Sequence, residues 1–329
     1  MSTPRPERTP VGSCCAVVTG GARGIGRAAA LALAADGFHV AVVDPGVALD
    51  GRRPDPAPAQ KVADEIRSAG GAAEAFGVDC RTPAAARELV ERVADWTSAS
   101  ALVLVHAAGT LRDGLLHTAG DDDWDEVLGA HLHVGVQLTR ALVPAMREAR
   151  WGRIVYVGGA AGLVGSVGQG AYDVAKAGLF GLMRGAALEL DRRGITVNYL
   201  VPFAYTRMTA SIPPATPALE RFKQHARSSR PCDVAPLVAW LCSERSAGVT
   251  GQVLGVRGAE LGLWSQPRPV QHAVRSEGFT PELVDVAVRG ALSVQLTPLE
   301  SEFDLFAEPA PPVSRADSTD CDHDRSDSR

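Results

Sequence analysis

Short, uninterrupted apolar runs alternate with longer amphipathic stretches over most of the chain. Uninterrupted runs are typical of strands buried on both faces of a parallel sheet, and apolar positions three and four apart indicate helices. We expect strands at residues 14–19, 38–43, 72–78, 101–105, 153–157, 196–201 and 252–256, and helical or amphipathic stretches at 25–35, 60–69, 83–96, 124–147, 171–192 and 233–242. This order predicts an α/β fold with a doubly wound, Rossmann-like parallel sheet in a single domain, residues 14–264.

The segments outside this alternation have other compositions. Residues 1–13 are polar and contain prolines, which predicts a disordered leader, and residues 45–59 are rich in Pro, Gly and Asp, which predicts a loop insertion. We expect a C-terminal helical extension at 265–299, with helices at 269–276 and at 280–292, the latter capped by Thr280. Residues 300–329 are acidic and rich in Ser and Pro, and predict a disordered tail.

Composition and charge exclude several classes of function. A net charge of -5 without clusters of Lys and Arg argues against a nucleic-acid partner. The apolar stretches are shorter than a membrane span, and the N-terminus lacks a signal-peptide pattern, so we expect a cytoplasmic protein with no membrane partner. The six cysteines are scattered, and we expect neither disulfides nor a metal site.

A glycine-rich turn joins the first predicted strand to the first predicted helix. It reads Thr19-Gly-Gly-Ala-Arg-Gly-Ile-Gly26. In such a turn, backbone N–H groups approach a pyrophosphate at the positive end of the helix dipole. The turn therefore predicts a dinucleotide cofactor, bound by Gly20, Arg23, Gly24, Ile25 and Gly26.

The choice between NAD and NADP depends on charges near this turn. Asp44 ends the second strand, where its carboxylate can accept hydrogen bonds from the adenosine ribose and repel a 2′-phosphate. Arg23 favours the alternative, NADP, because a guanidinium could reach that phosphate. We favour NAD. Asp79, which follows the third strand, either accepts a hydrogen bond from the adenine amino group or is a turn residue.

Tyr172 and Lys176 are the candidate catalytic residues. They stand four positions apart in a predicted helix and therefore share one face. An ammonium beside a phenol can lower its pKa from about 10, so that Tyr172 becomes an acid or base near neutral pH.

Together these motifs resemble the classical short-chain dehydrogenase/reductase family. Thr19–Gly26 is similar to its TGxxxGxG motif, Tyr172–Lys176 to its YxxxK motif, and Pro202–Thr206 to the segment that holds the nicotinamide amide. The strand-end motif Asn-Asn-Ala-Gly corresponds to residues 106–109, which end at Gly109. The resemblance implies that Pro202, Thr206 and Gly109 contact the cofactor.

One branch of the family is more similar than the rest, over residues 11–292. It is the (3R)-hydroxyacyl-CoA dehydrogenase domain of peroxisomal multifunctional enzymes, with its actinobacterial 17β-hydroxysteroid dehydrogenase-like relatives. The insertion after Asp44, residues 165–170 and residues 234–242 carry this resemblance. It implies a dehydrogenase that interconverts a ketone and a secondary alcohol.

Several positions depart from the family pattern. The serine that helps to hold the substrate oxygen is replaced by Gly159, and the loss of one such donor costs on the order of 10²- to 10³-fold in rate. Ser166 is either its substitute or a solvent-facing loop residue. His106 is either a packing residue or a cofactor neighbour. His131 replaces the asparagine of the proton relay, which is usual in this branch, and could order a water beside Lys176.

Three functions remain open. The first is an NAD(P)-dependent ketoreductase, the second is a non-redox enzyme of the cyclase or lyase type on the same fold, and the third is a cofactor-binding pseudoenzyme subunit. The substrate is expected to be apolar: a hydroxyacyl-CoA, a steroid or a natural-product ketone. The resemblance further implies a homodimer or homotetramer assembled through the helices at 124–147 and 171–192.

Overall fold

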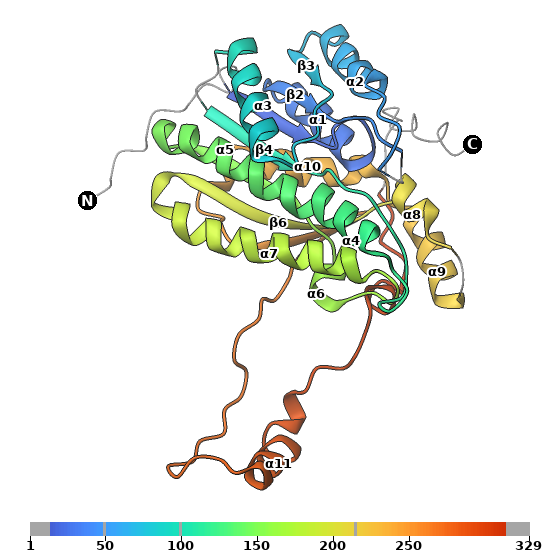
Figure 1. Ribbon diagram of the computed structural model, residues 1–329, viewed down its shortest axis with the longest axis vertical. Helices are drawn as coiled ribbons and strands as arrows, with labels where there is room; N and C mark the ends of the chain where they lie inside the picture. The colour runs from blue at the N-terminus through green and yellow to red at the C-terminus, as the bar shows by residue number, and fades with distance from the viewer. Residues whose placement is uncertain (1–13, 49–50, 99–100, 214–215, 314–329) are drawn as a thin grey trace.

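A central eight-stranded sheet organises the protein. The computed structural model describes residues 14–48, 51–98, 101–213 and 216–313 (Figure 1). The strand order is β3-β2-β1-β4-β5-β6-β7-β8, and all neighbouring pairs are parallel except β7 with β8. The strands are β1 (Cys14–Thr19), β2 (His39–Val43), β3 (Ala73–Phe76), β4 (Ala101–His106), β5 (Gly152–Val157), β6 (Ile195–Phe203), β7 (Val253–Arg257) and β8 (Glu260–Leu263). The predicted doubly wound, Rossmann-like fold is confirmed, and the antiparallel edge strand β8 is an addition to it.

Helices cover both faces of the sheet, because alternate residues of each apolar strand point to opposite faces. In β1, Ala16 and Val18 belong to one hydrophobic core and Cys15 and Val17 to the other. The first core is covered by α1 (Gly24–Ala35), α2 (Ala57–Ser68) and α10 (Pro231–Leu241), and the second by α3 (Pro83–Trp96), α5 (Val134–Ala149) and α7 (Gly170–Leu190) (Figure 1). Within the described residues, no helix is both long and apolar enough to cross a membrane.

The helix predicted at 124–147 is not one regular helix. It consists of α4 (Asp121–Leu128), a π-helical turn (Gly129–His133) and α5. At the turn, the His131 carbonyl accepts a hydrogen bond at 2.6 Å from Nε2 of His106 on β4, outside its own helix. A π-helical turn often marks a functional site, and this one turns the His131 side chain toward the carboxyl ends of the strands.

The C-terminal extension differs from its prediction. The described residues form no helix at 269–276, and the predicted helix at 280–292 is the shorter α11 (Pro281–Arg289), capped as expected by Thr280. Figure 1 shows this segment leaving the body of the molecule as an arm. Val270 and Val274 are 70% and 90% exposed, so the first stretch packs against nothing that would stabilise a helix.

The prediction of a disordered tail from residue 300 is wrong for the part of the tail that the structure describes. Here the short helix α12 (Glu302–Leu305) returns to the body. Phe303 is buried in a small core with Phe203 and with Phe222 of α9 (Pro217–Ala226). This aromatic contact stabilises the segment despite its acidic composition. The remainder of the predicted tail, 314–329, and the predicted leader, 1–13, lie outside the described residues.

Candidate functional site

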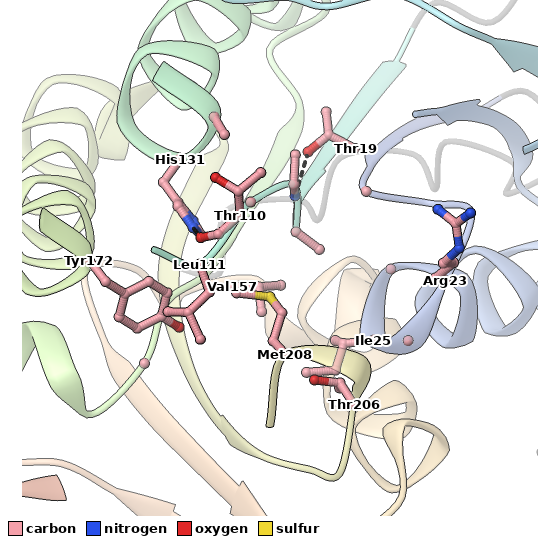
Figure 2. A pocket seen from close by; sticks show the side chains of 18 of the residues that line it. Thr19, Arg23, Ile25, Thr110, Leu111, His131, Val157, Tyr172, Thr206 and Met208 are labelled. Carbon is pink, nitrogen blue, oxygen red and sulfur yellow. Dashed lines mark hydrogen bonds between the residues drawn. The ribbon is translucent and has the colours of Figure 1, made fainter. Parts of the chain in front are cut away.

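One pocket follows the carboxyl ends of β1, β2, β4, β5 and β6. It lies where the strand order reverses between β1 and β4, the usual ligand site of a doubly wound sheet. Figure 2 shows Tyr172 and His131 at one end of it and Arg23 at the other. All of the predicted site residues line it: Gly20, Arg23, Gly24, Ile25, Gly26, Asp44, Asp79, Gly109, His131, Tyr172, Lys176, Pro202 and Thr206.

The glycine turn at one end of the pocket has a shape that only glycines permit. Gly20 has a φ of +64°, and a Cβ on Gly26 would lie 2.1 Å from the Gly20 carbonyl oxygen. Helix α1 begins there without a side-chain cap from its N-cap residue, Arg23. A helix N-terminus without a side-chain cap from its N-cap residue, next to a tight backbone turn, fits a pyrophosphate group.

Acidic groups line the same end of the pocket. The buried Asp44 accepts hydrogen bonds from the backbone N–H groups of Ala22 at 3.2 Å and of Gly46 at 2.7 Å, so its carboxylate is held at the end of β2. The exposed Asp79 accepts from the Arg81 N–H at 3.1 Å. Arg81 in turn donates two hydrogen bonds to Glu126, at 2.7 and 2.6 Å. Asp44 is thus held at the glycine turn through Ala22, and Asp79 is held by its local contact with Arg81.

Tyr172 and Lys176 lie on one face of α7, at the other end of the pocket. The Lys176 Nζ lies 5.2 Å from the centre of the Tyr172 ring and donates to the Val157 carbonyl at 2.8 Å. Burial lowers the pKa of Lys176 to about 7, partly offset by the charge of Glu302. We expected Lys176 to lower the pKa of Tyr172. Instead the pKa is raised well above 10, first by burial and next by Glu302, so the phenol keeps its proton.

Gly159 faces Tyr172 across an open space. A Cβ on Gly159 would lie 3.4 Å from the Tyr172 hydroxyl, so a side chain at this position would lie next to that hydroxyl. Behind the backbone, the Tyr199 hydroxyl accepts from the Gly159 N–H at 3.1 Å and lies 3.0 Å from the Gly159 carbonyl oxygen. Neither Tyr199 nor Ser166 is among the residues that line the pocket.

Two buried histidines form a directed chain of hydrogen bonds beside Tyr172. Nε2 of His106 lies within hydrogen-bond distance of the His131 carbonyl oxygen, which can only accept, so Nε2 carries the ring proton. Nδ1 of His106 therefore accepts from the Thr19 hydroxyl at 2.8 Å. Nε2 of His131 likewise donates to the Thr110 carbonyl at 2.8 Å. Burial, followed by the charge of Lys176, holds the pKa of His131 well below 6.5. His131 is therefore neutral, and its buried Nδ1 is an acceptor without a partner in the described residues.

The His131 ring also determines what can stand at position 109. It packs edge-on against Tyr172, with ring centres 5.2 Å apart. A Cβ on Gly109 would lie 1.9 Å from its Cε1 atom. The His131 ring therefore leaves no room for a side chain at position 109, which we predicted as a cofactor residue.

Comparison with known proteins agrees with this geometry. A family model described as enoyl-(acyl carrier protein) reductase matches residues 20–258. The chain belongs to the classical short-chain dehydrogenase/reductase family. Members of this family are oxidoreductases that use NAD or NADP.

Individual short-chain dehydrogenases and related enzymes are similar over most of the chain. The hydroxyacyl-CoA dehydrogenase ChsB1 of Mycobacterium tuberculosis is 39% identical over 77% of this chain and 80% of its own length. The peroxisomal multifunctional enzyme type 2 of Mus musculus is 35% identical over 82% of this chain but only 35% of its own length. The crystal structure of a short chain dehydrogenase from Mycobacterium avium superposes with a TM-score of 0.73 and 33% identity, covering 92% of this chain and 99% of that one.

Among the pocket residues that the sequence did not predict, one carries a carboxyl group. Glu302 of α12 lines the pocket together with Tyr172 and Lys176. The sequence around Glu302 carries two signals of an ordered helix: a capping box from Ser301 to Asp304, and two phenylalanines three positions apart. The acidic composition of the surrounding tail obscured both.

Proposed function

We propose that the chain is a ketoreductase that uses NAD(H) and interconverts a ketone and a secondary alcohol. One observation carries the proposal: Tyr172 and Lys176 line the same pocket as the glycine turn and Asp44. A proton donor and a dinucleotide site that share one pocket are what hydride transfer to a carbonyl needs.

The residues divide the reaction between them. The glycine turn and Asp44 would hold a reduced dinucleotide, which would supply the hydride that adds to the carbonyl carbon as the C=O π bond breaks. Tyr172 gives its phenolic proton to the resulting alkoxide oxygen and recovers a proton from solvent. Its raised pKa suits this direction, because the phenol stays protonated through the neutral range. The net change is ketone, reduced cofactor and one proton to alcohol and oxidised cofactor.

Lys176 and His131 would serve proton supply and cofactor orientation. Lys176 is held by the Val157 carbonyl, and its other N–H groups would be the donors offered to a bound cofactor. The partnerless Nδ1 of His131 can accept a hydrogen bond from a water beside Lys176. In this proposal, Pro202, Thr206 and Gly109 contact the nicotinamide half of the cofactor, and Asp79 contacts the adenine half.

Asp44 is the basis for proposing NAD rather than NADP. Its position at the end of β2 suits the ribose hydroxyls, and its charge opposes a 2′-phosphate. For the substrate, the apolar pocket residues Leu111, Met208 and Phe222 support a 3-oxoacyl thioester or another apolar ketone. We further propose a cytoplasmic homodimer or homotetramer that assembles through α5 and α7. Leu188 of α7 is 76% exposed, as an apolar residue of such an interface would be in a single chain.

The decisive test is NADH oxidation with a panel of acyl-CoA, steroid and aromatic ketones. We expect turnover that falls at least about 10²-fold in Tyr172→Phe, because the proton donor is lost. Because Gly159 removes the hydroxyl expected beside the substrate oxygen, a non-redox function is the second candidate. Conversion of a substrate without consumption of NADH would support that function and contradict ours. A chain that binds NADH but converts none of the ketones would be the pseudoenzyme.

A further inference from the structure

The C-terminal segment brings a carboxyl group into the substrate end of the pocket. The Glu302 N–H donates to the Gly165 carbonyl at 3.1 Å, and its side-chain Oε2 accepts from the Ala161 N–H at 3.1 Å. Both partners lie in the segment between β5 and α7, where Ala161 begins the short helix α6 (Ala161–Val164) two residues after Gly159. The Glu302 carboxyl is therefore hydrogen-bonded to the segment in which Gly159 replaces the serine of the family pattern.

The aromatic core holds α12 in this position. Phe303 stacks edge-on against Phe222 with ring centres 5.0 Å apart, and Phe306 packs on Phe203 at 4.9 Å. Phe203 ends β6 and Phe222 belongs to α9, so the segment is tied to the sheet and to the helix beside the pocket. A carboxyl held by packing on both sides is preorganised for contact with a ligand.

No positive charge neutralises this carboxyl directly. None of the ion pairs among the described residues involves Glu302. The titratable groups around it are Tyr172, Asp173 and Lys176 of α7 and Tyr199 of β6. Burial raises the pKa of Glu302 to about 7, against the opposing effect of the Ser166 hydroxyl. A carboxyl that is protonated near neutral pH can donate a hydrogen bond.

We propose that protonated Glu302 donates a hydrogen bond to the substrate oxygen and so takes over the role that Gly159 cannot fill. The proposal rests on the proposed ketoreductase function and adds a catalytic residue to it. Glu302 transfers no proton in this step. Its O–H group stabilises the negative charge that develops on the oxygen before Tyr172 protonates it.

The test measures kcat and KM for acetoacetyl-CoA with NADH, from pH 5.5 to 8.5, in the full-length protein. We expect Glu302→Ala to lower kcat about 10²-fold, as removal of one oxyanion donor does elsewhere. Glu302→Gln keeps an N–H donor, so its kcat should stay within about tenfold of wild type and should not fall above pH 7, where we expect the wild-type kcat to fall. Adding Gly159→Ser to Glu302→Ala should recover most of the loss.

A control variant and three further measurements separate this role from a structural one. Glu300→Ala removes an exposed carboxylate two residues away and should leave kcat unchanged. Melting temperature and NADH affinity show whether each variant folds and binds cofactor. Finally, the affinity for acetoacetyl-CoA in the presence of NAD⁺, where no reduction occurs, should fall above pH 7 in wild type but not in Glu302→Gln.

Two results would overturn the proposal while leaving the ketoreductase function intact. The first is a wild-type kcat in Glu302→Ala. The second is a Glu302→Gln variant as inactive as Glu302→Ala at every pH, which would require a carboxylate charge instead of a donor. A wild-type protein that does not oxidise NADH with any ketone refutes the ketoreductase function itself, and the proposal for Glu302 with it.

Discussion

The proposed cofactor end of the pocket is formed mainly by backbone, whereas the proposed substrate end is formed by side chains. At the cofactor end, the backbone of one strand, turn and helix forms the surface, and its shape depends on the absence of side chains at Gly20 and Gly26. At the substrate end, side chains from separate segments form the surface: His131 from the π-helical turn, Tyr172 from α7 and Glu302 from α12.

This difference governs how each end tolerates change. A site formed by backbone is one continuous stretch of the sequence. A single added Cβ atom there should therefore disrupt cofactor binding by the whole turn. The substrate end is assembled over long distances, since Tyr199 and Gly159 are 40 residues apart and Glu302 and Ala161 are 141 apart. There a group lost from one segment can be supplied by another, which is what we infer for Gly159 and Glu302.

The largest effect should follow from Gly26→Ala at the cofactor end. The new Cβ would lie 2.1 Å from the Gly20 carbonyl oxygen, so the backbone of the turn must move. Overpacking of this kind costs about 1–3 kcal/mol, and a cost of about 3 kcal/mol paid on binding corresponds to a roughly 100-fold rise in the Kd for NADH. A fluorescence titration with NADH measures it.

Gly185→Ala is the matched control for that substitution. Gly185 lies in α7, and a Cβ there would meet no atom within 4 Å. Alanine should raise the free energy of unfolding by roughly 0.5–1 kcal/mol and leave the Kd unchanged. Equal affinities in the two variants would contradict the claim that the turn has no room for a side chain.

At the substrate end, Glu302→Gln should change how stability depends on pH. The pKa of Glu302 is raised from 4.5 to about 7 by burial, so between these values the folded chain keeps a proton that the unfolded chain releases. Wild-type stability should therefore fall as pH rises through this window, by on the order of 3 kcal/mol, relative to the glutamine variant. Melting curves of both proteins from pH 4.5 to 8 measure the difference. Parallel curves would show that the carboxyl ionises normally.

The same contrast explains how much of the molecule could be predicted from sequence. The fold and the glycine turn follow from local patterns, and the predicted site residues do line one pocket. The helix at 269–276 was predicted from local composition, but no surface buries its apolar face. Glu302 could not be inferred from composition, because its order comes from Phe203 and Phe222, which are distant in sequence.

The smallest expected effect concerns the choice between NAD and NADP at the backbone-built end of the pocket. Asp44 is the one side chain there to which we assign a discriminating role. Asp44→Asn removes its charge while keeping one acceptor for the Ala22 and Gly46 N–H groups. We expect the ratio of NADP to NAD affinity to rise about tenfold, which corresponds to about 1.4 kcal/mol.

Asp79→Asn is the control that gives this ratio its meaning. Asp79 is a carboxylate at the end of the neighbouring strand and lines the same pocket, but we assign it to the adenine, which the two cofactors share. Its substitution should weaken both dinucleotides equally and leave the ratio unchanged. If instead Asp79→Asn changes the ratio and Asp44→Asn does not, the ribose lies farther along the sheet edge than the position of Asp44 implies. In that case a side chain outside the turn, and not the end of β2, selects the cofactor.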